Sequence, residues 1–117
     1  MATIKSFTSL EQSRKLAEFL PLESADMLFQ LGEDKYADSI RVPLTKKHWE
    51  QMIPDINPCW SLASLLSILP KGTRLLKSAT DDAYHCDCPK GNIDKWFDNA
   101  IDAAFEMVCW LKENNKI

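Results

Sequence analysis

The sequence contains no apolar run long enough to cross a membrane. Its longest nearly unbroken apolar stretch, CWSLASLLSILP at 59–70, spans twelve residues and includes three serines, whereas a membrane-spanning helix needs about 20 apolar residues. The opening segment, MATIKSFTSL, lacks the apolar core of a signal peptide. We therefore expect a cytoplasmic protein that does not contact membranes, and we expect its four cysteines to stay reduced there.

The sequence also lacks an excess of charge of one sign. It has 14 Lys and Arg residues against 17 Asp and Glu residues, a net charge of −3, and no run of like charges. Proteins that bind nucleic acid normally concentrate basic residues in a patch, because the release of counterions from phosphates supplies much of the affinity. The composition therefore argues against a nucleic-acid partner.

Familiar catalytic and cofactor-binding motifs are absent as well. The two histidines are His48 and His85, and no G-x-S-x-G elbow holds a nucleophile beside a base. The PKGT segment at 70–73 lacks the residue spacing of a phosphate-binding loop, and no dinucleotide fingerprint occurs. We expect a protein that is not an enzyme and that uses no cofactor.

The residues that are present predict one folded domain over 1–117. An apolar fraction of 45% and a charged fraction of 26% are ordinary for a soluble globular protein. A chain of this length buries roughly two thirds of its unfolded surface, which is enough for a core without disulfides or metal.

Capping residues predict three helices. Thr8 with Glu11 fits a capping box at the first helix. Asn57 followed by Pro58 combines a side-chain acceptor with a residue that needs no N–H, which favours a second helix start. Asp98 is the expected N-cap of the third helix. The predicted helices run from Thr8 to the residue before Pro21, over 58–69, and over 98–114.

Two groups of antiparallel strands are predicted from alternation and turn residues. Ile40 and Val42 alternate with polar neighbours, as in the half-buried second strand of a hairpin. The DD and PKGN segments favour turns between the strands of a meander. The predicted strands are 27–31 and 39–44 in the hairpin and 73–79, 82–88 and 93–97 in the meander, with a short helical turn at 45–52. The fold class is therefore α+β: an antiparallel sheet, made of the hairpin plus the three-stranded meander, packed against N-terminal, central and C-terminal helices.

The most distinctive segment is YHCDCPKGN at 84–92, which gathers a histidine and two cysteines. In a strand, successive side chains point to opposite faces, so Cys86 and Cys88 share one face with Tyr84, and His85 shares the other with Asp87. We predict that both thiols pack inside, as small apolar groups, with the histidine and the aspartate facing solvent.

A second interpretation of this segment is a small zinc-binding domain. Its candidate ligands are Cys86 and Cys88, with Cys59 or His85 joining them. Dense zinc patterns usually contain a second cysteine pair, which this sequence lacks. Zinc also needs its sulfur ligands within about 4 Å of each other, whereas alternate residues of a strand lie about 6.6 Å apart. No metal is therefore assigned, and a redox role for the thiols is a third interpretation.

The predicted central helix is apolar around nearly its whole circumference, relieved by Ser61, Ser64 and Ser67. Such a helix is either buried within the monomer or covered by another subunit, as in a dimer. Tryptophans on exposed faces often anchor partners, and Trp96 is open to the same two uses, core or interface. The candidate interface residues are Trp60, Leu62, Leu66 and Trp110.

Three segments carry a resemblance: TSLEQSRKLAEFLPLESADM, NPCWSLASLLSILPK and WFDNAIDAAFEMVCWLKENNKI. The chain resembles a group of short uncharacterised proteins encoded in Bacteroidales genomes, often in prophage-like or other mobile regions. The likeness is best in the P-C-W-S-L-A-x-L-L segment and in the D-N-x-x-D-A-x-x-E-M ending, and it does not include YHCDCPKGN. The group has no established activity, so the resemblance implies no catalytic residue and favours a small accessory protein over a metabolic enzyme.

Composition, motifs and resemblance together predict a function that is not enzymatic. We expect a small accessory protein that acts by binding another protein, whose identity the sequence does not give, or by self-association. The zinc-binding domain remains the alternative.

Overall fold

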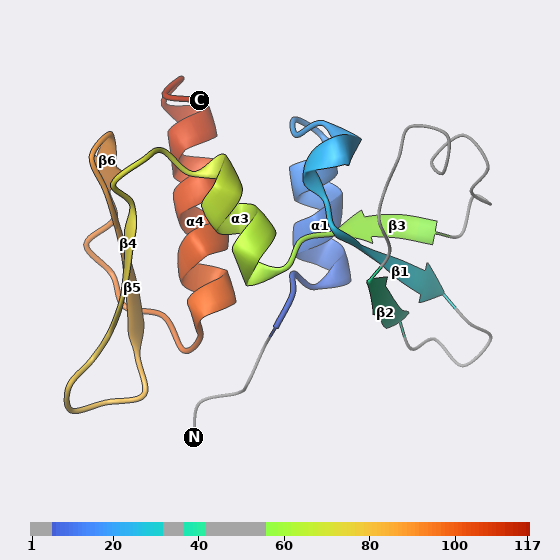
Figure 1. Ribbon diagram of the computed structural model, residues 1–117. Coiled ribbons are helices and arrows are strands. Elements are labelled where there is room, and N and C mark those ends of the chain that lie inside the picture. Colours follow the sequence, from blue (N-terminus) through green and yellow to red (C-terminus); the bar gives the residue numbers. More distant parts are fainter. Residues whose placement is uncertain (1–5, 32–36, 42–55) are drawn as a thin grey trace. The chain divides into compact units, whose positions relative to one another are not determined.

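The computed structural model describes residues 6–31, 37–41 and 56–117. The chain forms two compact units (Figure 1): unit 1 comprises Met1–Ser6 and Leu65–Ile117, and unit 2 comprises Phe7–Ser64. Each unit contains a three-stranded antiparallel sheet together with helix, so the predicted α+β class is confirmed. The predicted helical turn at 45–52 lies outside the described residues.

The sheet of unit 2 has the strand order β2-β1-β3. Strands β1 (Met27–Leu31) and β2 (Ala37–Arg41) form the predicted hairpin, with the second strand beginning earlier than expected. Strand β3 (Ile56–Cys59) pairs with the other edge of β1. The hairpin is therefore confirmed, and it is completed by a strand that the sequence did not predict.

The predicted helix start at Asn57 and Pro58 was wrong, because both residues belong to β3. Proline is tolerated in an edge strand, and it restricts the preceding residue to extended backbone, so the Asn-Pro pair suits β3 as well as a helix start. Helix α3 (Leu62–Ile68) begins later, after Ser61. The hydroxyl of Ser61 accepts a hydrogen bond from the backbone N–H of Ser64 at 3.2 Å, as in an N-cap.

Helix α1 (Leu10–Ala17) also begins later than predicted. Its N-cap is Ser9, whose hydroxyl accepts from the N–H of Gln12 at 3.1 Å, while the side chain of Gln12 accepts from the N–H of Ser9 at 3.0 Å. The capping box is therefore real but lies one residue after the predicted pair of Thr8 and Glu11. The hydroxyl of Thr8 has a different role.

Thr8 binds Trp60, which is fully buried in unit 2. The N–H of Trp60 donates to the hydroxyl of Thr8 at 3.0 Å, and the N–H of Thr8 donates to the carbonyl of Trp60 at 2.9 Å. The Thr8 hydroxyl also lies 2.7 Å from that of Ser13. The indole N–H of Trp60 donates to the hydroxyl of Ser24, in the 3-10 helix η1 (Leu22–Ser24), at 3.0 Å. Trp60 precedes α3 and lies in the interior, the buried alternative that the sequence left open for this segment.

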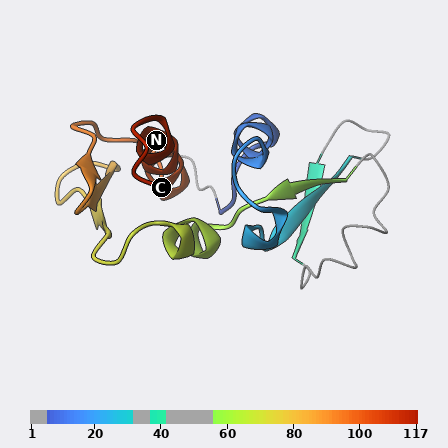
Figure 2. The same ribbon diagram turned by 90° about the horizontal axis from the view of Figure 1, so that it is seen from above.

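Unit 1 contains the predicted meander, with the strand order β4-β5-β6. Strands β4 (Arg74–Lys77) and β5 (Tyr84–Cys88) pair as expected. Helix α4 (Ala100–Glu113) contacts all three strands and lies on one face of this sheet (Figure 2). We call the face toward α4 the inner face and the opposite one the outer face.

The third strand of the meander is shorter than predicted and begins earlier. Strand β6 (Gly91–Asn92) follows a two-residue turn, so only the first half of the predicted PKGN turn is a turn and its second half is the strand. The predicted strand 93–97 is absent apart from a bridge at its last residue. Phe97 reaches the sheet through a single bridge to Tyr84. The segment between β6 and Phe97 therefore leaves the sheet.

Helix α4 confirms the predicted third helix, with a small shift at its start. Its N-cap is Asn99 and not Asp98: the Asn99 side-chain oxygen accepts from the N–H of Asp102 at 2.8 Å. The apolar side chains on one side of α4 form a buried stripe, because the apolar side of a helix faces the core. Its members are Ile101, Ala104, Phe105, Val108 and Leu111.

Gly91 is placed against the ring of Trp110. A Cβ atom added to Gly91 would lie 2.0 Å from Cζ3 of Trp110, far inside any contact distance. Trp110 is half-buried, and its indole covers the backbone of β6. Only glycine fits between this strand and α4.

Asp26 fixes the start of α3 within unit 2. One carboxylate oxygen accepts from the N–H of Ser61 at 2.9 Å, and the other accepts from the Ser61 hydroxyl. Burial alone would raise the pKa of Asp26, but hydrogen bonds from Ser61 favour the ionised form and hold the pKa below its ordinary value of 3.8.

We expect Gly91→Ala to lower the free energy of unfolding by about 1–3 kcal/mol, because the new methyl group collides with Trp110. Thermal and urea denaturation measure the change. Asn92→Ala, at the exposed next residue, is the control and leaves stability nearly unchanged. In a Trp110→Leu background the cost of Gly91→Ala shrinks, since the ring is gone. A Gly91→Ala protein as stable as the parent would contradict this packing.

We expect Asp26→Asn to lower stability by about 1 kcal/mol at neutral pH, because a carboxylate is the stronger acceptor and Asp26 is partly exposed. Since the folded pKa lies below the unfolded value of 3.8, the stabilisation is complete above that value and is lost as pH falls through the folded pKa. Denaturation curves of the two proteins should therefore converge in acid. A stability difference that stays constant down to the acid-unfolding range would show that ionised Asp26 does not act in this way.

Candidate functional site

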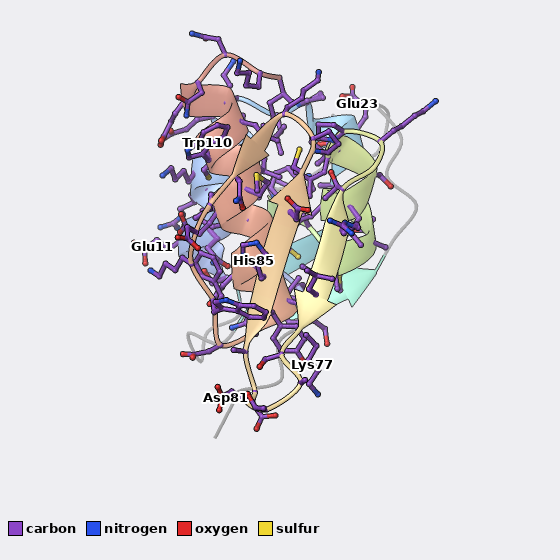
Figure 3. All side chains as sticks on the ribbon, turned by 90° about the vertical axis from the view of Figure 1, so that its left-hand side faces the viewer. Glu11, Glu23, Lys77, Asp81, His85 and Trp110 are labelled. Atoms are coloured by element: carbon purple, nitrogen blue, oxygen red, sulfur yellow. The ribbon has the colours of Figure 1, made fainter. Side chains whose placement is uncertain are left out.

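The side-chain alternation predicted for β5 is confirmed. Cys86 and Cys88 are 2% and 6% exposed and lie on the inner face, which packs against α4. His85 and Asp87 alternate with them and are half-buried on the outer face. In Figure 3 the outer face is turned toward the viewer, with His85 upon it and α4 behind the sheet.

Burial favours the protonated form of two of the thiols, Cys86 and Cys59. Burial raises the pKa of Cys86 to about 11, with smaller contributions from Cys88 and Asp87. Burial also raises the pKa of Cys59, in unit 2, to about 12, with a contribution from the charge of Asp26. The thiolate is the form that attacks electrophiles and binds metals. These cysteines therefore have the environment of structural residues.

Within unit 1, the predicted metal ligands do not share one face. His85 points to the opposite face of β5 from Cys86 and Cys88. Cys59 belongs to unit 2. Within residues 6–31, 37–41 and 56–117, no three His, Cys, Asp or Glu side chains are arranged to hold a metal ion. The zinc interpretation gains no support from the cysteine strand.

The outer face carries large apolar side chains that are exposed. In the register of the sheet, Leu76 of β4 lies directly opposite His85 of β5. The ring of Trp96 lies 5.3 Å from that of His85, centroid to centroid, and is tilted by 35°. Leu76 is 41% exposed and Trp96 is 49% exposed. These three residues form a contiguous surface, here called the Leu76–His85–Trp96 patch.

A hydrogen bond orients His85 within the patch. Its Nδ1 lies 3.1 Å from the carbonyl oxygen of Lys95. Because a carbonyl oxygen only accepts, Nδ1 carries the proton in this contact. The ring is therefore held on the outer face by the chain segment that also presents Trp96.

A charged pair lies beside the patch on the outer face. Arg74 of β4 lies opposite Asp87 of β5 and donates to its carboxylate at 2.7 Å, and the Arg74 side chain is 68% exposed. Lys77 lies opposite Tyr84 on the other face of the sheet, with its ammonium 5.8 Å from the ring centroid of Tyr84. Polar groups beside an apolar centre are usual in a protein-binding surface.

The other predicted interface residues differ in exposure. Leu66 of α3 is exposed, whereas Leu62 is half-buried. Trp110 contacts β6 as described and is half-buried. The sequence left Trp96 open to either use, because it predicted a strand over 93–97. The observed strand β6 ends at Asn92, so Trp96 lies outside it.

Comparisons with known proteins give no assignment. No known protein family, curated protein or solved structure matches the chain. In the part of the chain that the structure describes, no helix combines the length and the apolarity that crossing a membrane requires.

We expect the four cysteines to be nearly unreactive in the native protein, because all four are buried. Ellman's reagent at mildly alkaline pH should label them slowly without denaturant and rapidly in guanidinium chloride. Rapid labelling of Cys86 in the native protein, detected by its loss in Cys86→Ala, would contradict a buried thiol.

Since the folded pKa of Cys86 is raised to about 11, stability should also fall as pH rises above the ordinary value of 9.0.

Proposed function

We propose that this protein is a non-enzymatic accessory protein that binds another protein through the Leu76–His85–Trp96 patch. The observation that carries the proposal is the exposure of Leu76 and Trp96 on one continuous surface with His85 between them. A single exposed apolar residue needs no explanation. Two large ones joined through an aromatic ring form a patch of the kind that marks interaction sites.

The side chains of the patch suit recognition. Tryptophan is among the residues that contribute most to binding energy, because a rigid ring buries a large area when a partner covers it. Trp96 is held beside His85, and His85 is held by the Lys95 carbonyl, so little freedom is lost on binding.

The same geometry supports a role other than catalysis. Acid–base and nucleophilic catalysis need a base within hydrogen-bond reach of the reacting group. His85 is bound to a backbone carbonyl, and Asp87, on the same face of β5, is bound to Arg74. The buried cysteines also fit the reducing cytoplasm that we propose as the compartment.

The resemblance to short proteins of Bacteroidales mobile regions supports an accessory role. A protein of this kind acts on a host or element-encoded protein without chemistry of its own. We propose a partner other than a second copy, because Trp60, the main residue from which self-association was predicted, is buried in unit 2.

We expect Trp96→Ala to weaken partner binding by about thirtyfold, the effect of losing one interface hot spot. The tagged protein and its variants are used to capture partners from a Bacteroidales lysate, and the captured proteins are quantified by mass spectrometry. Leu66→Ser is the matched control, since it also removes an exposed apolar side chain but lies on α3.

Light scattering of the purified protein completes the test. A monomer at all micromolar concentrations is expected. Capture that is equal for the parent, Trp96→Ala and Leu76→Ser would show that the patch does not bind a partner.

A further inference from the structure

Strand β4 is an open edge of its sheet. Among the strands that the structure describes, β5 is its only neighbour. Arg74, Leu76 and Lys77 are exposed, and Leu75 is half-buried. An edge strand presents backbone N–H and C=O groups that can pair with an added strand.

The hydrogen bonds of β5 show which groups of β4 point outward. Tyr84 exchanges both of its backbone hydrogen bonds with Phe97, so its polar groups point away from β4. In an antiparallel strand the next residue points the opposite way, so His85 bonds its register partner Leu76. Leu75 and Lys77 therefore direct their N–H and C=O groups to the open side.

The edge carries positive charge. Residues 70–77 contain Lys71, Arg74 and Lys77 and no acidic residue. Lys71 and Lys77 are exposed, whereas Arg74 is paired with Asp87. The acidic residues of the following loop come after β4 has ended. The open edge thus combines unused backbone groups with two exposed ammonium groups.

We infer that the partner supplies an extended segment with acidic side chains, which adds to the sheet as a strand beside β4. This inference rests on the proposed function, because the added strand would continue the outer face at Leu76. Backbone hydrogen bonds to Leu75 and Lys77 provide affinity, and alternate side chains of the segment provide specificity. The side chains on one face of the added segment cover Leu76, and the acidic side chains of the segment lie near Lys71 and Lys77.

An acidic segment suits this edge better than a second copy of the chain. Pairing two β4 strands would bring the same lysines of both copies into one short ribbon, where like charges oppose each other. An acidic segment neutralises them and also favours rapid encounter.

Two variants of one residue test the backbone pairing. Lys77→Gln removes the charge and keeps the N–H, whereas Lys77→Pro removes the charge and the outward N–H. Because this N–H does not bond β5, proline is compatible with the edge position. Circular dichroism and thermal denaturation confirm that both variants are folded.

The probe is a phage-displayed library of random peptides selected on the immobilised full chain. We expect the selected peptides to be β-prone and acidic, and to bind Lys77→Pro about fivefold to tenfold more weakly than Lys77→Gln. Hydrogen exchange of the Leu75 and Lys77 amides should slow when such a peptide binds. Basic or helix-forming selected peptides, or equal binding to the two variants, would overturn the inference.

The two proposals fail in different ways. If Trp96→Ala abolishes capture of the cellular partner and Lys77→Pro matches Lys77→Gln, the edge-strand inference is wrong and the proposed function stands. If Trp96→Ala and Leu76→Ser leave capture unchanged, the proposed function is wrong.

Discussion

The double hydrogen bond between Thr8 and Trp60 is the constraint on which unit 2 depends. It joins the residue before the N-cap of α1 to the end of β3, across 52 residues of chain. The Trp60 indole then bonds Ser24, so the helical and strand segments of the unit share one buried centre. An indole N–H and a hydroxyl buried without partners would each cost stability, which makes this set of bonds specific for one arrangement.

Unit 1 is built on a different constraint, the close approach of α4 to its sheet. The ring of Trp110 covers Gly91, and the inner face of β5 contributes two cysteines to the same packing layer. Thiols fill this layer because they are small and weakly polar. Burial in this layer raises the pKa of Cys86 and keeps its thiol from reacting.

Elements with strong periodicity could be predicted from the sequence, and their boundaries could not. Alternation in β5 predicted the correct faces, because side-chain direction in a strand depends on local geometry. The starts of α1 and α3 were missed, since Thr8 and Pro58 have local preferences for a helix start that distant pairing overrides. Trp96 was left unassigned for the same reason. Its exposure depends on where β6 ends, which is at Asn92, four residues before Trp96.

The alternation of β5 has an evolutionary consequence. Of its five consecutive residues, one set packs against α4 and the alternate set faces outward, so the two sets are under different constraints. A lineage can replace the outward residues without repacking the interior, while the inward thiols continue to specify the fold. Related chains should accordingly vary most at every second position of this strand, with the substitutions confined to one side of the pleat.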